Sequence, residues 1–411
     1  MLSFFENGSL DSLSRVEKKK FLSKLQIIKN IFLYQECDCS YIAKQVHLSV
    51  PTTQTLINEL LENGIILEKG QGSSKGGRRP LIYGMNGESF YLLCIDIGRF
   101  HVRFTILDSK LHIRAGIETH EIKFHDSTDY LDQICEYAFS FLNTSGIDKK
   151  LFIGIGLSMP GAIDSRKGIN YSYFFNPEEP LTTTLEKRFK LPVFLENDTN
   201  VLTLAELWYG QARNVRNALV LLISWGVGLG LILNSKLYRG ASGFAGEFSH
   251  IPAVDNGILC WCNKQGCLET VASATALSRL VIEGIKNGHA SSIFRSMDPD
   301  NDHIDPSKVI AAAKQGDQFA VNILYKVGFE LGKGIAALIQ ILNPEVVILE
   351  GRMAKAEQYI ITPIQHALNS YCNPLLIKNT QIVVTELGEE ATGLGLGIMV
   401  VDKLLSNYEH A

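Results

Sequence analysis

One histidine and three cysteines fall within eighteen consecutive positions of this sequence: His250, Cys260, Cys262 and Cys267. This ligand set suits a closed tetrahedral Zn²⁺ site, in which imidazole nitrogens and thiolate sulfurs surround one ion. Cys260 and Cys262 lie too close in an extended chain for an easy mutual disulfide, whereas a metal accepts both sulfurs at about 2.3 Å. The alternative is a loop with three ordinary reduced cysteines and a satisfied histidine, because Cys-x-Cys-x₄-Cys is not a common finger spacing. We predict a structural zinc knuckle at residues 250–267.

The composition bounds the kind of chain that carries this cluster. With 411 residues and 46% hydrophobic content, the chain can bury large cores, and its length predicts two or three domains. Eight cysteines and no charged-then-apolar leader favour a reducing cytosol over a secreted disulfide framework. No apolar run of the sequence reaches the roughly 18 residues of a membrane-spanning helix. We therefore expect a soluble, cytoplasmic protein.

The first ninety residues carry the pattern of three helices. Apolar residues recur at helical spacing from Lys20 to Tyr34, which predicts an amphipathic helix. A second, short helix fits Ser40–His47 with Ser40 as its N-cap. A third helix begins with Pro51 and ends at Asn63-Gly64. Together they predict a helix-turn-helix, whose second helix enters the major groove of double-stranded DNA. Its start offers short polar groups able to reach base edges and phosphates: Thr52, Thr53, Gln54 and Thr55.

A basic loop between two short strands follows directly. The strands are predicted at Ile65–Lys69 and Leu81–Tyr83, and the Gly/Ser-rich loop between them carries Lys75, Arg78 and Arg79. Such a hairpin beside a helix-turn-helix is a wing, able to lie along phosphates or reach into a minor groove. A flexible basic linker after a small helical protein-interaction module is the alternative. We place a winged helix-turn-helix, DNA-binding domain at residues 1–88.

The remainder of the chain alternates strand and helix patterns. Apolar runs such as Tyr91–Ile97 and Val346–Leu349 predict buried strands, and stretches such as 274–287 and 320–341 predict helices. This alternation indicates an α/β protein with mixed sheets in two lobes. Ligands of such folds gather at strand ends, where Asp, Asn and Gly residues of this chain stand.

Short polar motifs punctuate residues 91–400. They are Met159-Pro160-Gly161, Glu196-Asn197-Asp198, Gly246-Glu247-x-x-His250, Cys260-x-Cys262-x₄-Cys267-Leu268-Glu269 and Leu342-Asn343-Pro344-Glu345. In this conjunction the chain resembles the ROK family of repressors, open reading frames and sugar kinases. The resemblance implies a two-lobed sugar-kinase/actin-like (ribonuclease H-like) fold at residues 89–411, with zinc on the histidine and three cysteines. It favours the family's bacterial repressors that respond to glucose or N-acetylglucosamine metabolism, because the family's kinases lack the amino-terminal DNA-binding part.

The resemblance also implies a sugar pocket, with sugar-binding residues Asn197, Asp198, Glu247, His250 and Glu269. Carboxylates and an amide suit this role, because a hexose hydroxyl both donates and accepts hydrogen bonds. As an alternative, Asn197 and Asp198 simply start the helix that follows them. One nitrogen of His250 would hold zinc, which leaves the other to contact a hydroxyl and couple metal to ligand.

The sequences of two turns help to distinguish a repressor from a kinase in this family. Asp198 would be the general base of a kinase, and it is present. The family's kinases carry Asp-x-Gly-Gly-Thr and Gly-Thr-Gly turns at the ATP phosphates, whereas this chain has Asp96-Ile97-Gly98-Arg99-Phe100 and Ser224-Trp225-Gly226. Bulky side chains there would block close approach of the backbone to phosphate. We expect a sugar-responsive transcriptional repressor and no enzyme; an ATP-dependent hexose or N-acetylhexosamine kinase is the alternative.

The expected partners follow from this interpretation. They are a double-stranded DNA operator, a sugar or sugar phosphate, and a second copy of the chain in a homodimer or in a tetramer. A third hypothesis is that a sugar-transport protein, and not a free sugar, controls DNA binding.

Overall fold

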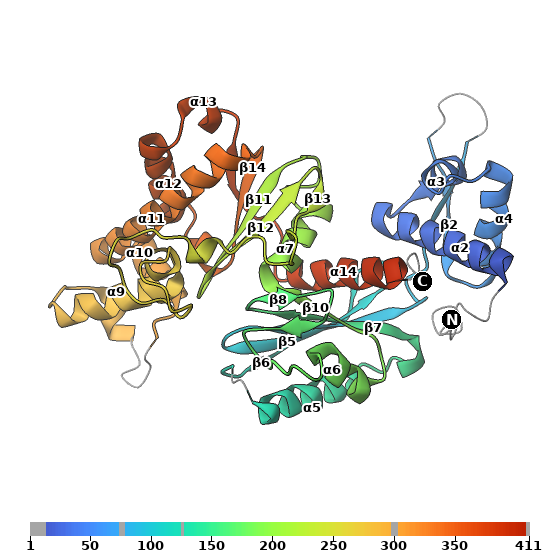
Figure 1. The fold of residues 1–411 in the computed structure, drawn as a ribbon, viewed down its shortest axis with the longest axis horizontal. Helices are drawn as coiled ribbons and strands as arrows, with labels where there is room; N and C mark the ends of the chain where they lie inside the picture. The colour runs from blue at the N-terminus through green and yellow to red at the C-terminus, as the bar shows by residue number, and fades with distance from the viewer. Residues whose placement is uncertain (1–13, 74–78, 125–126, 297–302, 408–411) are drawn as a thin grey trace. The chain divides into compact units, whose positions relative to one another are not determined.

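The computed structural model describes residues 14–73, 79–124, 127–296 and 303–407 (Figure 1). The chain divides into two compact units: the first holds residues 1–201 and 390–411, and the second holds residues 202–389. Each unit contains a five-stranded sheet with helices packed on it, which confirms the predicted α/β class. The predicted wing residues Lys75 and Arg78 lie outside the described residues.

The helix-turn-helix belongs to the first unit and has three helices, α2 (Arg15–Tyr34), α3 (Cys39–Gln45) and α4 (Val50–Glu62). α2 begins earlier than predicted because Ser14 and Glu17 form a capping box, each side chain accepting from the other's backbone N–H. Asp38 caps α3 by accepting from the N–H of Tyr41, so the predicted cap Ser40 is wrong. Local capping chemistry therefore moved both helix starts towards the amino terminus.

Three short strands complete this head: β1 (Cys37–Asp38), β2 (Ile66–Gln71) and β3 (Leu81–Met85). They pair antiparallel in the order β1-β3-β2, and β2 with β3 is the predicted hairpin. The head has an apolar core of its own, in which Ile28, Ile57 and Tyr83 expose at most 1% of their surface.

The larger sheet of the first unit orders its strands β10-β7-β4-β5-β6. The strands are β4 (Tyr91–Ile97), β5 (His101–Asp108), β6 (Ile113–Glu121), β7 (Phe152–Met159) and β10 (Val193–Asn197). β10, β7 and β4 run parallel, and β5 and β6 run antiparallel to their neighbours. Figure 1 shows α5 (Thr128–Thr144) and α6 (Leu181–Phe189) on one face and α14 (Ala391–Asn407) on the other. A small hairpin, β8 (Ile163–Asp164) and β9 (Ile169–Asn170), follows β7.

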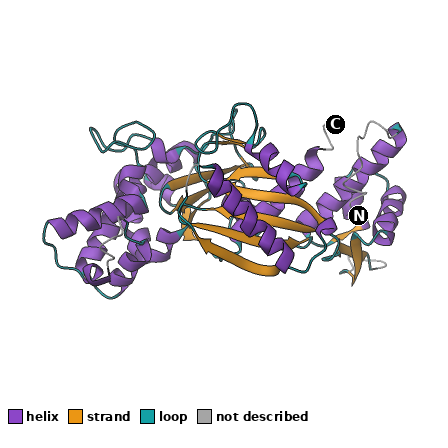
Figure 2. Cartoon of the chain, turned by 90° about the horizontal axis from the view of Figure 1, so that it is seen from below, coloured by secondary structure: helices purple, strands orange, loops and turns teal. Residues whose placement is uncertain are grey.

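The sheet of the second unit has the order β13-β12-β11-β14-β15. Its strands are β11 (Ala218–Ile223), β12 (Val227–Leu233), β13 (Lys236–Leu237), β14 (Val346–Glu350) and β15 (Gln381–Val384). The helices of this unit, purple in Figure 2, are α8 (Glu269–Ala272), α9 (Ala274–Lys286), α10 (Pro306–Lys314), α11 (Gln318–Leu342), α12 (Gln358–Tyr371) and α13 (Pro374–Ile377). α7 (Asp198–Trp208) starts in the first unit and ends in the second.

Two glycines let α11 and α12 pack closely. A Cβ on Gly328 would lie 2.6 Å from Pro363 Cγ, and a Cβ on Gly332 would lie 2.7 Å from Ala367 Cβ. Close packing of this kind fixes one arrangement of the two helices. Although α11 has 25 residues, none of the helices described in the structure is both long and apolar enough to cross a membrane.

Candidate metal and sugar sites

Four side chains of the second unit gather in one cluster. Donor atoms of His250, Cys260, Cys262 and Cys267 all lie within 4.8 Å of one another. His250 Nδ1 is 3.6 Å from Cys260 Sγ, and Cys262 Sγ is 3.6 Å from Cys267 Sγ. Ligands held tetrahedrally at about 2.3 Å from Zn²⁺ would be about 3.8 Å apart. The four residues predicted from the sequence therefore form a group that could hold one tetrahedral metal ion.

The knuckle loop, residues 250–269, takes its shape from the backbone. Pro252 and Cys267 pair in a short antiparallel bridge. Gly266 has a φ of +72°, and a Cβ on it would lie 1.8 Å from the carbonyl oxygen of Val254. Only glycine fits there, and the resulting turn sets the position of Cys267 in the cluster.

The imidazole of His250 has two different neighbours. It ends a 3₁₀ turn (Phe248–His250), and its Nδ1 faces the cysteines while its Nε2 lies 3.9 Å from Glu247 Oε2. A Cβ on Gly246 would lie 2.1 Å from Leu229 O, so glycine is required just before Glu247. The predicted sugar ligand Glu247 thus lies beside the ring nitrogen that does not face the cysteines.

Glu269 is held by a residue that the sequence interpretation missed. The indole Nε1 of Trp261 donates to Glu269 Oε1 at 2.7 Å. The Trp261 ring also meets the His250 ring edge to face, with centroids 4.9 Å apart. A Cβ on Gly226 would lie 2.8 Å from Glu269 Oε2, so the carboxylate lies against the backbone there. Trp261 stands between two cysteines of the cluster in the sequence, and that position was the available signal.

Asn197 and Asp198 lie where β10 ends and α7 begins. Asn197 donates to Gly161 O at 3.2 Å and accepts from the N–H of Thr199 at 3.0 Å and of Asn200 at 3.3 Å. Its amide therefore starts the helix, which was the alternative interpretation of this residue.

Among the described residues, Thr199 bonds one oxygen of the Asp198 carboxylate, through its N–H and its hydroxyl. Asp198 Oδ1 accepts from the Thr199 N–H at 2.7 Å. Burial raises the pKa of Asp198 to about 6, and the Asp96 charge raises it too, against the hydrogen bond from Thr199. A carboxylate that ionises near pH 6 can accept a proton or a hydroxyl hydrogen bond at neutral pH.

The five residues predicted to bind sugar divide between the two units. Asn197 and Asp198 belong to the first unit, whereas Glu247, His250 and Glu269 belong to the second. Within the second unit the structure brings these three together around the cysteine cluster, through His250 and Trp261.

The β4–β5 turn, residues 96–101, is filled by side chains. A Cβ on Gly98 would lie 2.5 Å from the ring of His101, and His101 Nε2 is 3.9 Å from Asp96 Oδ2. The Arg99 guanidinium lies 5.4 Å from the centre of the Phe100 ring. His101 was not singled out from the sequence, because its ring reaches Gly98 only through the fold of the turn.

Comparison with known proteins gives the family. The sequence model of the ROK family matches residues 92–403. The chain belongs to the ROK family. It is 30% identical to a xylose repressor of Caldicellulosiruptor bescii over 95% of this chain and 98% of that repressor. It is 34% identical to a glucokinase of Thermotoga maritima, over 76% of this chain and 98% of the kinase. A solved ROK transcriptional regulator, homologous to the Escherichia coli MLC protein, superposes with a TM-score of 0.79 at 24% identity, covering 95% of this chain and 99% of the regulator. The two-lobed ROK fold is thereby confirmed.

The second turn expected to differ from ROK kinases joins β11 to β12. Trp225 is half-buried there, and its ring lies 5.9 Å from that of His303. Its carbonyl oxygen accepts from the Thr275 hydroxyl at 2.7 Å. The indole thus packs against the core of the second unit.

The start of α4 in this ROK chain presents only some of the predicted DNA contacts. Thr52 and Thr55 are exposed. Thr53 has no exposed surface and its hydroxyl donates to Ser49 O at 3.0 Å, so it cannot reach DNA and that prediction is wrong. Gln54 is half-buried and donates to Tyr83 Oη at 3.1 Å and Asn58 Oδ1 at 2.9 Å. In the wing, Arg79 is exposed.

Two buried glutamates of the second unit were not anticipated from the sequence. Glu206 and Glu350 expose 0% and 6% of their surface, and Glu350 Oε1 has no hydrogen-bond partner within the described chain. The Thr385 hydroxyl donates to Glu206 Oε1 at 2.5 Å. Burial raises the pKa of Glu350 to about 8, and the Glu206 charge acts in the same direction, against the hydrogen bond from Thr385. The pair therefore keeps a proton at neutral pH.

Proposed function

We propose that this chain is a sugar-responsive transcriptional repressor of carbohydrate uptake or metabolism genes. The observation that carries the proposal is the union, in one chain, of a winged helix-turn-helix head and a ROK domain that together match 98% of a xylose repressor. The glucokinase relative matches only 76% of this chain. A kinase has no use for the additional DNA-binding head.

DNA recognition would use the head in a symmetric pair. Thr52, Gln54 and Thr55 on α4 would face the major groove, and Arg79 with Lys75 and Arg78 of the wing would contact the phosphate backbone. Two heads of a homodimer bind half-sites about 34 Å apart, so a rigid-body shift between them weakens binding. A tetramer would pair two such dimers.

The side chains predicted for sugar recognition would offer hydrogen-bond acceptors to the hydroxyl groups of a sugar or sugar phosphate. Asp198 and Glu269 each offer acceptors for hydroxyl groups, and Glu247 with His250 Nε2 adds a further pair. Asn197 already has its amide engaged in the helix start, so its role would be to orient Asp198.

Zn²⁺ is the ion that one imidazole and three thiolates favour. When bound, it would supply a structural clamp that holds the knuckle loop together. The residues of the chain do the remainder: Trp261 holds Glu269, and His250 keeps its second nitrogen beside Glu247.

An ATP-dependent sugar kinase is the second candidate, and Asp198 is the observation in its favour. A carboxylate with its pKa raised to about 6 suits a general base. Both phosphate turns argue against it, because His101 and Trp225 fill them. Sugar-dependent ATP turnover with glucose, N-acetylglucosamine or N-acetylmannosamine that Asp198→Asn abolishes would establish the kinase.

Location and control follow from the proposed role. A repressor acts on the chromosome, which places this protein in the cytoplasm. A sugar-transport protein is an alternative source of control, and a pull-down with membrane transport components, in parallel with free sugars, separates the two.

The proposal is tested by selection on sheared genomic DNA. Immobilised protein should enrich one class of fragment that contains two related half-sites, and one sugar or sugar phosphate should release it. Xylose, glucose, N-acetylglucosamine and N-acetylglucosamine-6-phosphate form the first ligand panel, screened in advance by thermal shift. Recovery of fragments without any common site would reject the repressor.

A further inference from the structure

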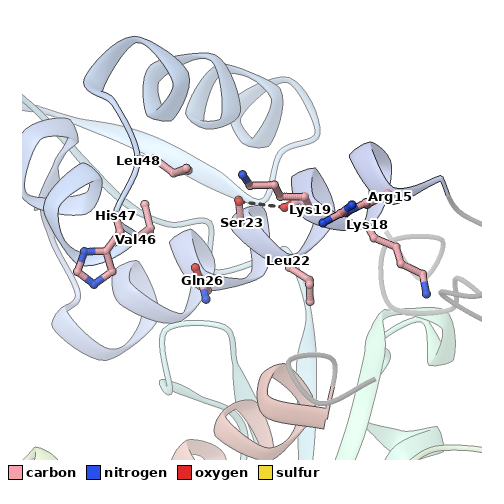
Figure 3. A pocket seen from close by; sticks show the side chains of 9 residues that line it. All are labelled: Arg15, Lys18, Lys19, Leu22, Ser23, Gln26, Val46, His47 and Leu48. Carbon is pink, nitrogen blue, oxygen red and sulfur yellow. Dashed lines mark hydrogen bonds between the residues drawn. The ribbon is translucent and has the colours of Figure 1, made fainter.

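A basic cavity lies in the head, between the first half of α2 and the turn that joins α3 to α4. It has a volume of about 440 Å³ and is lined by Arg15, Lys18 and Lys19 of α2 and by His47 and Leu48 of the turn (Figure 3). No carboxylate is among the described residues that line it. Arg15 and Lys19 therefore line the cavity together with polar and apolar side chains, and the described lining carries no negative charge.

The cations of α2 are sorted between two faces of the helix. Lys20 and Lys24 each lie 2.6 Å from the carboxylate of Glu59 and neutralise it. Arg15 and Lys19, four positions apart, share the other face. Within the described part of the chain no carboxylate pairs with either of them, and Glu17 next to them bonds to Ser14.

The cavity lies next to the helix end that enters DNA. His47 has a φ of +54°, which reverses the chain, and Leu48 directly precedes Ser49, the N-cap of α4. In a helix-turn-helix this end of the recognition helix enters the major groove, whose edges are lined with phosphates. The partial positive charge of the α4 start adds to the positive field of the cavity.

We propose that this cavity binds a phosphate of the DNA backbone, with Arg15 and Lys19 as the pairing groups. The proposal rests on the proposed repressor function. The Arg15 guanidinium can pair two phosphate oxygens, and the Lys19 ammonium provides a second charge. Such a contact anchors the head on the duplex and fixes its register, and it reads no base. Free phosphate or a sugar phosphate has the same chemistry, and the experiment separates these sources.

The test compares two adjacent lysines in the full-length protein. Fluorescence anisotropy measures the affinity for a 40-base-pair duplex at several salt concentrations, for the unaltered protein, Lys19→Gln and Lys20→Gln. Lys19→Gln should weaken binding at least about 5- to 10-fold at 0.1 M salt and reduce the slope of log affinity against log salt by about 0.9 for each bound head, the value of one phosphate contact. Lys20→Gln loses the same charge on the Glu59 face and should keep the slope. Arg15→Lys should keep it as well, because the charge remains.

The outcomes distinguish this inference from the function beneath it. Equal slopes for Lys19→Gln and the unaltered protein overturn the cavity assignment alone, as does an equal loss in Lys20→Gln. Binding of inorganic phosphate that Lys19→Gln abolishes while DNA affinity stays unchanged assigns the cavity to a small anion and overturns the proposal. If the unaltered protein binds no duplex, both the cavity assignment and the repressor fall.

Discussion

The knuckle loop and the β4–β5 turn differ in what their side chains do. In the knuckle loop, the Trp261 indole and the backbone at Gly226 hold the Glu269 carboxylate in a fixed position. In the β4–β5 turn, the His101 ring lies against Gly98, and the Arg99 guanidinium lies over the Phe100 ring. Side chains in the first region hold a carboxylate in place, and a side chain in the second region packs against the backbone of the turn. Under the proposed repressor function, the first region would serve sugar recognition, and the second would leave little room for a nucleotide phosphate.

Removing a cysteine of the cluster should have the largest effect, because it disrupts the knuckle loop and leaves the β4–β5 turn unchanged. Cys260→Ser should lose the bound metal and lower the free energy of unfolding by more than about 3 kcal/mol, because loss of a structural metal is among the most destabilising changes. Elemental analysis and thermal unfolding measure both. Cys39→Ser, outside the cluster, is the control and should retain the metal. Equal metal content in the two variants would contradict the zinc assignment.

Asp198 tests whether the sugar chemistry is for binding or for catalysis. Asp198→Asn should weaken sugar binding about 30-fold or more without any change in ATP turnover, which we expect to be absent in both proteins. Since the pKa of Asp198 is raised to about 6 and the ionised carboxylate is the better acceptor, sugar affinity should increase as pH rises through 6. Calorimetric titration at pH 5 and pH 7.5 measures this rise, which should vanish in Asp198→Asn. A pH-independent affinity in the unaltered protein would remove Asp198 from the site.

Trp261 tests how the knuckle loop orients its carboxylate. Trp261→Phe keeps an aromatic ring on His250 but loses the N–H that holds Glu269, so sugar affinity should fall about 5- to 10-fold. Metal content and melting temperature should stay close to those of the unaltered protein. Leu259→Ala, a change at an exposed position of the same loop, should leave the affinity alone. If both variants bind sugar equally well, Glu269 needs no support from the indole.

Glu350 has the smallest expected effect on sugar binding, because it concerns stability alone. Its pKa is raised to about 8 in the folded protein, above the ordinary value near 4.5, so the folded state binds the extra proton between these pH values. The free energy of unfolding should therefore fall as pH rises from 5 to 8, by at most about 1.4 kcal/mol per pH unit from this group. Glu350→Gln should flatten that dependence in urea unfolding. An unchanged slope would mean that other groups set it.

The sequence predicted what depends on short-range spacing. It predicted the four residues of the cluster, the helix-turn-helix and the wing hairpin, since ligand spacing, periodicity and turn residues are local signals. The buried Thr53 was also within reach, because it precedes Leu56 and Ile57 by three and four positions and so shares their inward face.

Contacts between distant segments were beyond the sequence. Trp261 finds Glu269 only when the knuckle loop closes, and His101 covers Gly98 only in the folded turn. Glu206 and Glu350 are more than a hundred positions apart, and only the fold of the second unit makes them neighbours. Tertiary packing, which no local pattern encodes, creates each of these pairs.

Gln54, which we propose contacts a base, is already hydrogen-bonded within the head. Its amide is already satisfied by Tyr83 and Asn58, so the wing strand and the recognition helix share it. To form hydrogen bonds with an adenine edge, the amide must give up its bonds to Tyr83 and Asn58. At any other base, it would keep these intramolecular bonds. Discrimination between bases at this position would then come from competition with bonds inside the protein. The Tyr83→Phe variant should therefore discriminate less between duplexes that differ at this base than the unaltered protein does.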